Sequence, residues 1–512
     1  MPTAWVEPAD VGLNDGWKNT NLISLVSALQ AWFGNIDGID FTWTNGLVMY
    51  GDVDGCGQSL YNVKKWFGPA AGNVQVRDAS GFGISPSATG TQNATALQAA
   101  IDDLPNGIGG CVIVPPGVYT INPGIYMSGS TYSTKTIPNV TLMGFGDCTT
   151  LKLATNTGES IFIDMRSQAN MTIRDLCYDG NGSLQGTTSS FLSADATTNG
   201  KLINVTVKNI VFTGGGSPGA AGIGAGSSDF VISDCRFSYE GRITGSGSQT
   251  PSASHVLIED SFFSIPSTAN GDGAIFPYQS RGWIVSGCIF AGTDTVTTNR
   301  CAVYAGAGTY YSPALFALTG NAFDRCGKVV KLYVATADAL KPTINQFSIS
   351  GNSMRKSLTA GVWLEAGGNY AGYLPMNYNL VFGNSLSKNG NYGIGSPVAA
   401  QVAEKAASSY SSIFGDVVIN HAIAGIGFDG NDAYATEASA VNNTIMGNAC
   451  GDTRSAGASQ DHGISLDGSK FNVAYAACIS DNMVLANACS ENTVSDYEDT
   501  GVDNVLAHNQ ET

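Results

Sequence analysis

Charged side chains are scarce in this sequence, since Asp, Glu, Lys and Arg together make up 13% of its 512 residues. The balance is acidic, with 24 basic residues against 41 acidic ones and a formal net charge of −17. Binding to nucleic-acid phosphates or to an anionic membrane surface requires clustered basic side chains. The composition therefore argues against nucleic acid and against a membrane surface as partners.

The sequence also lacks targeting and metal-binding signals. Its first residues, MPTAWVEPADVGLND, include acids and have neither the basic start nor the apolar core of a signal peptide. No run approaches the roughly 20 apolar residues of a membrane span, so we expect no signal peptide and no membrane insertion. The 11 cysteines are scattered without a C-x-x-C pair, and there are four histidines. We therefore expect free thiols, with no metal and no cofactor.

Glycine, in contrast, is abundant at 64 residues, which suits a chain with many tight turns. A length of 512 residues exceeds that of one ordinary globular domain. A repeat fold escapes this limit because each repeat packs only on its neighbours.

The stretch NATALQAAIDDLPNGIGGCVIVPPGVYTI, residues 93–121, predicts a short helix that leads into two strands. Leu97, Ile101 and Leu104 recur at helical spacing, so a helix is expected over about 94–104, with Asn93 or Thr95 as its N-cap. The apolar run CVIV and the following VYTI are too short for helices and are interpreted as strands. Such a helix would cover bare strand edges at the end of a stack.

These parts resemble the first segment of the pectate-lyase superfamily, in the subfamily that includes many phage tailspikes and polysaccharide depolymerases. The matching stretches are VQVRDASGFG (74–83), LQAAIDD (97–103) and GGCVIVPPGVYTI (109–121), whereas TGTQNAT replaces the usual acidic pair before the helix. The resemblance implies an all-β chain. It implies a right-handed single-stranded parallel β-helix of the pectin-lyase-like type over residues 73–512, a capping helix, and a small N-terminal region over residues 1–72.

A recurring motif, an apolar strand followed by a turn and a small polar residue, supports this expectation. Its intervals begin near 26 residues and widen to about 32, a period typical of solenoids. Stacked small polar residues can hydrogen-bond one another, which resembles the asparagine ladder of parallel β-helices. Cysteines in the column are interpreted as small ladder residues rather than as catalytic thiols. The aligned residues are Asn209, Cys235, Ser261, Cys288, Asn321, Asn352, Asn384, Asn443 and Asn482, with Asn420 as a possible extra rung.

The N-terminal region holds five of the seven tryptophans and a helix predicted over residues 21–33 that is apolar on most sides. Such a helix must be buried, either against another subunit or against the first coils of its own chain. In tailspikes, the region before the β-helix attaches the protein to the virion. We therefore predict an attachment or oligomerisation role for residues 1–72.

Proteins of the resembled family bind extended polysaccharide along one sheet, and their hydrolases use two carboxylates. No family motif carries catalytic residues over, so the candidates rest on their position at the edges of a second recurring strand. Coils stack about 4.8 Å apart, which brings carboxylates on neighbouring coils within the separations that glycosidases use. Glu240 and Asp272 form the preferred pair, Glu365 is a third candidate, and Asp429 and Asp467 occupy similar edges.

Aromatic residues near these edges are candidates for stacking on sugar rings, although aromatics in such folds also form core stacks. The candidates are Tyr278, Trp283, Tyr304, Tyr310, Tyr311 and Trp363.

Three functions remain open from the sequence. The first is a homotrimeric, virion-located tailspike that binds and depolymerises host cell-surface polysaccharide by glycoside hydrolysis. The second is a non-catalytic virion spike or capsid decoration protein, and the third is a bacterial enzyme such as a polysaccharide lyase. The missing export signal favours a virion protein, because virion proteins are made in the host cytoplasm.

Overall fold

The protein forms two compact units, Met1–Val53 and Asp54–Thr512. All residues described by the computed structural model belong to the second unit. The predicted helix at residues 21–33 and nearly all of the predicted N-terminal region therefore lie outside the described residues, and the boundary at residues 72/73 stays a prediction. The described residues are 66–67, 75–122, 124–127, 137–155, 161–164, 169–181, 190–193, 203–213, 221–223, 228–237, 243–245, 254–265, 274–277, 281–292, 301–307, 314–334, 344–367, 376–377, 379–389, 392–396, 404–405, 408–409, 412–421, 424–429, 440–441, 443–451, 460, 462–467, 479–480, 482–490, 492, 495–499, 504–507 and 509–511.

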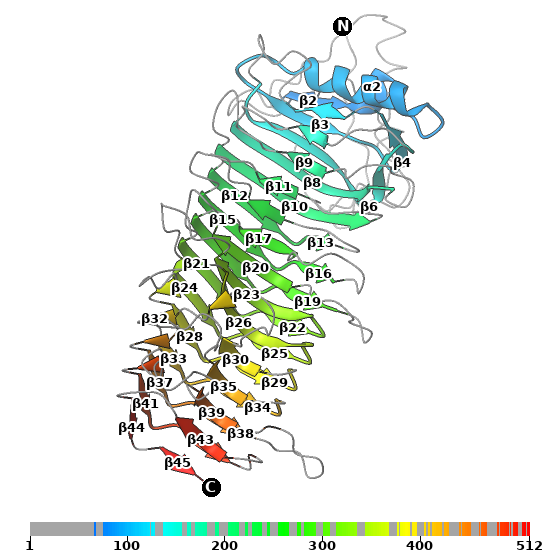
Figure 1. Ribbon diagram of the computed structural model, residues 1–512. Coiled ribbons are helices and arrows are strands. Elements are labelled where there is room, and N and C mark those ends of the chain that lie inside the picture. Colours follow the sequence, from blue (N-terminus) through cyan, green and yellow to red (C-terminus); the bar gives the residue numbers. More distant parts are fainter. Residues whose placement is uncertain are drawn as a thin grey trace, which may run out of the picture. The chain divides into compact units, whose positions relative to one another are not determined.

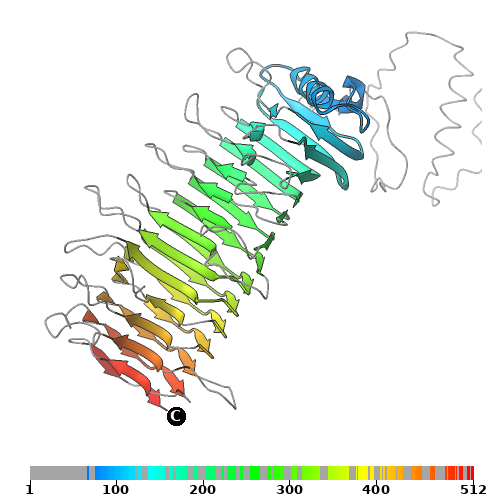
Figure 2. The ribbon, with the colours of Figure 1, turned by 45° about the vertical axis from the view of Figure 1, so that its right-hand side comes forward.

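The described strands of the second unit form one sheet of 31 strands and one of 14 strands. Each strand of a coil pairs in parallel with its equivalent in the next coil, so that the rungs stack from the helix-capped end towards the C-terminus (Figures 1 and 2). Among the described pairings, only β1–β2 and β26–β31 are antiparallel. The predicted all-β parallel β-helix is therefore confirmed.

The 31-stranded sheet begins with long strands and then divides each coil into two short strands on either side of a corner. Its first part comprises β1 (Trp66–Phe67), β2 (Gln75–Asp78), β3 (Gly110–Ile113), β4 (Gly117–Ile121), β6 (Val140–Leu153), β8 (Ala169–Asp179) and β10 (Ile203–Thr213). The strands before the corner are β12 (Ser228–Ser233), β15 (Ser254–Glu259), β18 (Arg281–Ser286), β21 (Ala314–Thr319), β24 (Ile344–Ser350), β27 (Met376–Asn377), β28 (Leu380–Phe382), β32 (Ser408–Ser409), β33 (Ser412–Phe414), β36 (Ala440–Val441), β37 (Thr444–Met446), β40 (Ile479–Ser480), β41 (Met483–Leu485) and β44 (Val505–Ala507). The strands after the corner are β13 (Arg236–Phe237), β16 (Phe262–Ser264), β19 (Ile289–Ala291), β22 (Ala322–Asp324), β25 (Ser353–Arg355), β29 (Ser385–Ser387), β34 (Val417–Ile419), β38 (Ala449–Gly451), β42 (Ala488–Ser490) and β45 (Gln510–Glu511).

The 14-stranded sheet forms another face of the same coils. In chain order its strands are β5 (Ile125–Tyr126), β7 (Ile161–Asp164), β9 (Ser190–Ser193), β11 (Ala221–Ile223), β14 (Ile243–Gly245), β17 (Ile275–Pro277), β20 (Cys301–Ala307), β23 (Lys328–Val334), β26 (Ala360–Gly367), β30 (Tyr392–Ser396), β31 (Glu404–Lys405), β35 (Ala424–Asp429), β39 (His462–Asp467) and β43 (Ser495–Asp499).

The core lies inside the coils because side chains along each strand alternate between the two faces. In β15, for example, Val256 and Ile258 are buried, whereas Leu257 between them is partly exposed. Side chains of the same type in successive coils stack on one another. Five phenylalanines form a continuous interior column with centroid separations of 4.5 to 4.7 Å: Phe212, Phe237, Phe263, Phe290 and Phe323.

A column of buried polar residues lies at the corner between the two short strands. Asn352 shows its chemistry: its Oδ1 accepts hydrogen bonds from the backbone N and the Nδ2 of Asn321, and its own Nδ2 donates to Leu318 O and to Asn384 Oδ1. Each rung thus satisfies buried backbone groups of its neighbours. Strand register places one column through Cys235, Ser261, Cys288, Asn321, Asn352, Asn384, Asp416, Asn448, Asn487 and Asn509.

Three of the sequence-aligned residues lie elsewhere. Asn209 is exposed, has a φ of +51° and donates to Asp175 Oδ1 at 2.8 Å, because the residue in register with Cys235 is Ile210. Asn443 and Asn482 belong to a second buried amide column, which continues to Asn504.

Asn420 is not the missing rung of the main column either. The rung between Asn384 and Asn448 is Asp416, whose Oδ1 accepts hydrogen bonds from both the backbone N and the Nδ2 of Asn384. The backbone N of Asp416 in turn donates to Asn448 Oδ1 at 2.9 Å.

Helix α2 (Gly90–Asp102) covers the N-terminal end of the coils, after a 3-10 turn η1 (Ala79–Phe82). It begins four residues before the predicted start because Thr89 forms a capping box with Gln92. Asn93, one of the predicted caps, lies instead within the helix, where its buried side chain accepts a hydrogen bond from Ser85 N and donates one to Thr120 O. Leu97 and Ile101 are fully buried, so the helix closes the open end of the core.

Candidate functional site

The outward face of the 14-stranded sheet carries a row of aromatic and basic side chains on consecutive coils. Tyr304, Lys331 and Trp363 are in register on β20, β23 and β26. Each is flanked by residues of the interior core, such as Val303 and Ala305 around Tyr304, so alternation directs these three side chains outward.

These side chains contact one another along the row. The Phe276 ring stacks on Tyr304 with a centroid separation of 4.9 Å. The Nζ of Lys331 lies 5.4 Å from the centroid of the Tyr304 ring, and the Nζ of Lys328 lies 4.1 Å from that of Trp363. Cation–π contacts of this kind contribute about 0.5–2 kcal/mol each. The row is therefore an ordered surface of ring faces and ammonium groups.

Exposure varies along the row. Tyr304 and Lys331 are partly exposed, whereas Trp363 is 7% exposed and Lys328 8%. The register continues from Trp363 to Gly395 and Gly427, so the sheet carries no side chain at the next two positions of the row. We name the residues from Phe276 through Tyr304, Lys331 and Trp363 to Gly427 the outer row.

Three acidic residues occupy backbone positions beside the outer row. Glu365 and Asp429 each lie two residues after a row position, Trp363 and Gly427 respectively, and Asp429 is in register with Asp467. With strands about 4.8 Å apart, the backbone of Asp429 lies about 5 Å from that of Asp467 and about 10 Å from that of Glu365. The pairing of Asp429 with Asp467 is a geometric feature that sequence position alone did not single out.

The preferred pair from the sequence, Glu240 and Asp272, lies outside the described residues. Glu240 comes three residues before Ile243 on β14, and Asp272 comes three residues before Ile275 on β17. Ile243 and Ile275 are in register with each other. Glu365 on β26 is three strands from β17, about 14 Å, which exceeds the carboxyl separations that glycosidases use. The roles of Glu240, Asp272 and Glu365 in catalysis stay predictions.

The aromatic candidates divide in the same way. Tyr304 and Trp363 belong to the outer row, and Trp283 is 1% exposed within the interior core. Tyr278, Tyr310 and Tyr311 lie outside the described residues.

The ladder cysteines are poor nucleophiles. Burial raises the pKa of both the Cys235 and the Cys288 thiols to about 12, so neither forms a thiolate near neutral pH. Among the described residues, no group of three or more His, Cys, Asp or Glu side chains is placed to hold a metal ion. No helix in the described part of the chain is long and apolar enough to cross a membrane.

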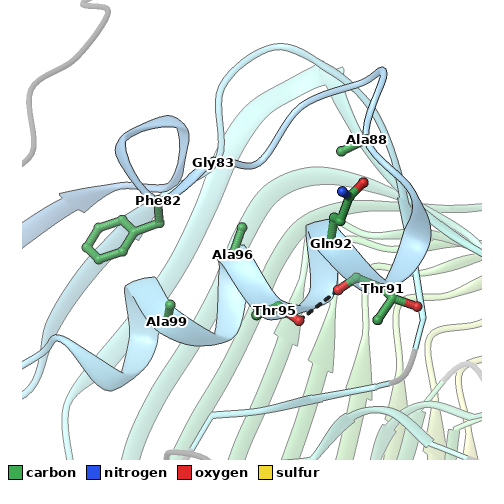
Figure 3. Close-up of a pocket in the computed structure, with 8 residues that line it drawn as sticks. All are labelled: Phe82, Gly83, Ala88, Thr91, Gln92, Thr95, Ala96 and Ala99. Atoms are coloured by element: carbon green, nitrogen blue, oxygen red, sulfur yellow. Dashed lines mark hydrogen bonds between the residues drawn. The ribbon is translucent and has the colours of Figure 1, made fainter.

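A pocket of about 410 Å³ lies on the outer side of α2 (Figure 3). Phe82 and the alanines of the helix provide its apolar wall, and the Thr95 hydroxyl donates to Thr91 O at 2.8 Å rather than into the pocket. The lining contains no titratable side chain, so the pocket offers no acid–base chemistry. It is lined by Phe82, Gly83, Ala88, Thr91, Gln92, Thr95, Ala96 and Ala99.

No protein-family model and no curated protein sequence matches this chain. Three solved structures share its architecture. The A-module of mannuronan C-5 epimerase AlgE6 from Azotobacter vinelandii aligns over 85% of this chain and 99% of its own, with 16% identity and a TM-score of 0.53.

The catalytic unit of a GH87 α-1,3-glucanase from Streptomyces thermodiastaticus aligns over 86% of this chain and 69% of its own, with 13% identity and a TM-score of 0.50. Pre-mature gene product 12 of bacteriophage phi29 aligns over 82% of this chain and 53% of its own, with 15% identity and a TM-score of 0.55. Together with the stacked parallel coils and the capping helix, these likenesses establish that the chain has the right-handed parallel β-helix fold of the pectin-lyase-like proteins.

Proposed function

We propose that this protein is a tailspike-like virion protein that binds host cell-surface polysaccharide along the 14-stranded sheet and depolymerises it by glycoside hydrolysis. The observation that carries the proposal is the outer row. Aromatic ring faces favour the apolar faces of sugar rings, and the partly exposed Lys331 can donate hydrogen bonds to hydroxyl or carboxylate oxygens. The row extends along the coil axis, as binding of an extended polymer requires.

In this proposal the acidic residues beside the row, Glu365, Asp429 and Asp467, supply the chemistry. Hydrolysis needs one carboxylic acid to protonate the leaving oxygen and a second carboxylate as nucleophile or base. The backbone of Asp429 lies about 5 Å from that of Asp467 and about 10 Å from that of Glu365. These backbone spacings allow the carboxyl groups to reach the separations of a retaining or an inverting pair. Two of the three similar structures are named for activity on polysaccharides, which agrees with this proposal.

The binding step is tested with a panel of purified capsular polysaccharides and O-antigens on a glycan array. We expect Tyr304→Ala and Lys331→Ala each to weaken binding about tenfold, through loss of about 1.4 kcal/mol of stacking or hydrogen bonding. Phe145→Ala is the matched control, because Phe145 is a 46% exposed aromatic on β6 of the 31-stranded sheet, outside the 14-stranded sheet that carries the outer row. Equal loss in Tyr304→Ala and Phe145→Ala would contradict the assignment of the row.

The hydrolytic step is tested by release of reducing ends from a polysaccharide that binds. Asp429→Asn, Asp467→Asn and Glu365→Gln are compared with Glu240→Gln and Asp272→Asn. Loss of an essential carboxylate should lower the rate by about 10² to 10⁴ while binding persists. Unsaturated uronate products, detected by their ultraviolet absorbance, would show that the protein is a lyase and not a hydrolase.

A non-catalytic virion spike or decoration protein is the second candidate. The observation that favours it is the near-complete burial of Trp363 and Lys328, whose mutual contact already occupies one ring face. Binding without any release of reducing ends or unsaturated products would support this alternative. Both candidate functions include the predicted homotrimer, the virion location and virion attachment through residues 1–72.

A further inference from the structure

The corner of the 31-stranded sheet changes its chemistry partway along the protein. In the earlier coils the residue immediately before the ladder position is Asp175, Asn209, Asp234 or Asp260, each with a positive φ of 48–56°. Charged residues lie next to this position in the earlier coils. One of them is Lys208, whose Nζ lies 3.4 Å from Oδ2 of Asp234. From Gly287 onward the same position is glycine in six successive coils and then Ala486.

The described outward positions directly at this corner, up to the first outward residue of the strand that follows it, are then uncharged in eight successive coils, from β18 and β19 to β44 and β45. The next outward position carries charge in two of these coils, where Asp324 on β22 and Arg355 on β25 form an ion pair at 2.8 Å. At the chain's overall frequency of 13% charged residues, about four of these positions would carry a charge. We name this surface the neutral corner. It comprises Ile284, Ser286, Gly287, Ile289, Ala317, Thr319, Gly320, Ala322, Ser348, Ser350, Gly351, Ser353, Leu380, Phe382, Gly383, Ser385, Ser412, Phe414, Gly415, Val417, Thr444, Met446, Gly447, Ala449, Met483, Leu485, Ala486, Ala488, Val505, Ala507 and Gln510.

The neutral corner is also apolar and exposed. Six of the 13 exposed large hydrophobic residues in the described part of the chain belong to it: Ile284, Ile289, Val417, Met446, Met483 and Val505, with 43–50% exposure. Ile284 and Ile289 lie in the first of its coils, and the other four residues lie in the last four coils. Exposed apolar surface of this kind marks an interaction site.

The glycines at the corner leave its backbone bare. A Cβ added at Gly320, Gly383, Gly415 or Gly447 would meet no atom within 4 Å, so the fold of this chain does not exclude a side chain there. The positive φ does not by itself require glycine, because Asp, Asn and Ala adopt it at the same position in other coils. What glycine provides is access for another backbone or side chain to approach closely.

We propose that the neutral corner is the surface through which copies of this chain pack side by side along the β-helix. The area is sufficient: eight coils span about 34 Å, and six residues across the corner span about 20 Å. This gives about 700 Å² per copy, close to the roughly 800 Å² per partner of a standard stable interface.

Charge and periodicity select a second copy as the occupant. With a net charge of −17, two copies repel each other overall, and the neutral corner is a face where contact brings no like charges together. A second copy also presents the same coil repeat of about 4.8 Å, so its exposed side chains can fit between the rungs. Charge returns beyond the neutral corner, first with Asp324 and Arg355 and then with Arg325, Lys356 and Lys388 at the following turn, as in the polar rim of an interface.

The test is the mass of the full-length chain by size-exclusion chromatography with multi-angle light scattering. We expect the wild type to be an oligomer, and Val417→Glu combined with Met446→Glu to shift it at least 100-fold towards monomer. Both positions are more than 40% exposed, so the charges should leave the coils folded. Val118→Glu is the matched control, because Val118 is 55% exposed on β4, outside the neutral corner, and should keep the wild-type mass.

Circular dichroism and the melting temperature verify that the variants are folded. As a second measurement, Ala449→Cys on the exposed corner should form a disulfide between copies under oxidising conditions, whereas Val118→Cys should not. A monomeric wild type, or a double variant that stays oligomeric while folded, would overturn the proposal. If the double variant keeps its mass but no longer binds polysaccharide, the neutral corner binds the glycan and not a second copy of the chain.

Discussion

At the scale of single residues, Asp416 is a carboxylate in a column of amides. Each amide rung around it donates through Nδ2 to a carbonyl of the preceding coil, as Asn384 does to Ile349 O and Asn448 does to Ile413 O. The Oδ2 of Asp416 occupies the corresponding place, is buried and has no hydrogen-bond partner among the described residues. Burial raises the pKa of Asp416 to about 6, against the opposing effect of the hydrogen bonds from Asn384.

This raised pKa makes the stability of the protein depend on pH. Well below pH 3.8 the carboxyl group is protonated in both the folded and unfolded states. Between about pH 4 and 6 the unfolded chain loses this proton first, so folding becomes less favourable as the pH rises, and the loss is complete above the folded-state pKa. The total is about 3 kcal/mol, from a shift of about two pH units at 1.36 kcal/mol each.

Asp416→Asn should therefore raise the melting temperature at pH 7.5 and leave it nearly unchanged at pH 4. The new Nδ2 can make the hydrogen bond that the other amide rungs make. Thermal unfolding followed by circular dichroism between pH 4 and 8 measures the effect. Asp260→Asn, at an exposed corner position, is the control. If Asp416→Asn instead lowers the melting temperature at pH 7.5, the ionised Asp416 carboxylate stabilises the folded protein and the prediction is wrong. The Cys450 thiol, which interacts electrostatically with Asp416, has a pKa raised by its hydrogen bond to Cys489 and by burial, so it stays neutral in this range.

The ladder was predictable in its period and in most of its members, because small polar residues follow apolar strands at regular intervals. The position of Asn209 was misjudged by one residue, since Asn at a left-handed corner and Asn inside the column look alike in sequence. The stronger signal is a pair, glycine followed by a small polar residue, as at Gly351–Asn352 and Gly415–Asp416. It separates the corner residue from the ladder residue and identifies Asp416.

At the scale of elements, α2 is the part of the described chain that covers the bare edge of the first coil. Its start depends on the capping box, in which Gln92 N donates to Thr89 Oγ1 at 3.3 Å and Thr89 N donates to Gln92 Oε1 at 2.9 Å. Sequence periodicity located the buried stripe of this helix correctly but not its start, because its first turn has no apolar spacing to reveal it.

Thr89→Ala should loosen the cap without unfolding the coils. Loss of an N-cap side chain costs about 1 kcal/mol, which corresponds to about fivefold faster hydrogen exchange in α2 and in the β2 and β3 strands below it. Native-state hydrogen exchange with mass spectrometry measures this change. Thr95→Ala is the control, because its hydroxyl bonds only within the helix and alanine favours helix. Unchanged exchange in Thr89→Ala would mean that side-chain packing alone fixes the cap.

At the scale of the whole molecule, the sequence was sufficient for the fold class but not for the site. The fold is repeated in every coil, so many weak signals add up to one answer. The site depends on which coil positions share a column on the outward face, and loops of variable length between strands hide that register. The pairing of Asp429 with Asp467, and of Tyr304 with Lys331, emerges only when the strands are aligned in space.

Because each coil packs only on its neighbours, the molecule should tolerate removal of one complete coil. Ladder residues Asn352, Asn384, Asp416 and Asn448 follow one another at intervals of 32 residues. Deletion of residues 384–415 joins Gly383 to Asp416 and leaves every remaining side chain in its column, so the shortened chain should fold and unfold cooperatively. Deletion of residues 400–415 removes half a coil and moves the following strands onto the wrong sheet, so that variant should lose its cooperative transition. Circular dichroism and thermal melts compare the two, and equal damage from both deletions would show that coils contribute to stability beyond their nearest neighbours.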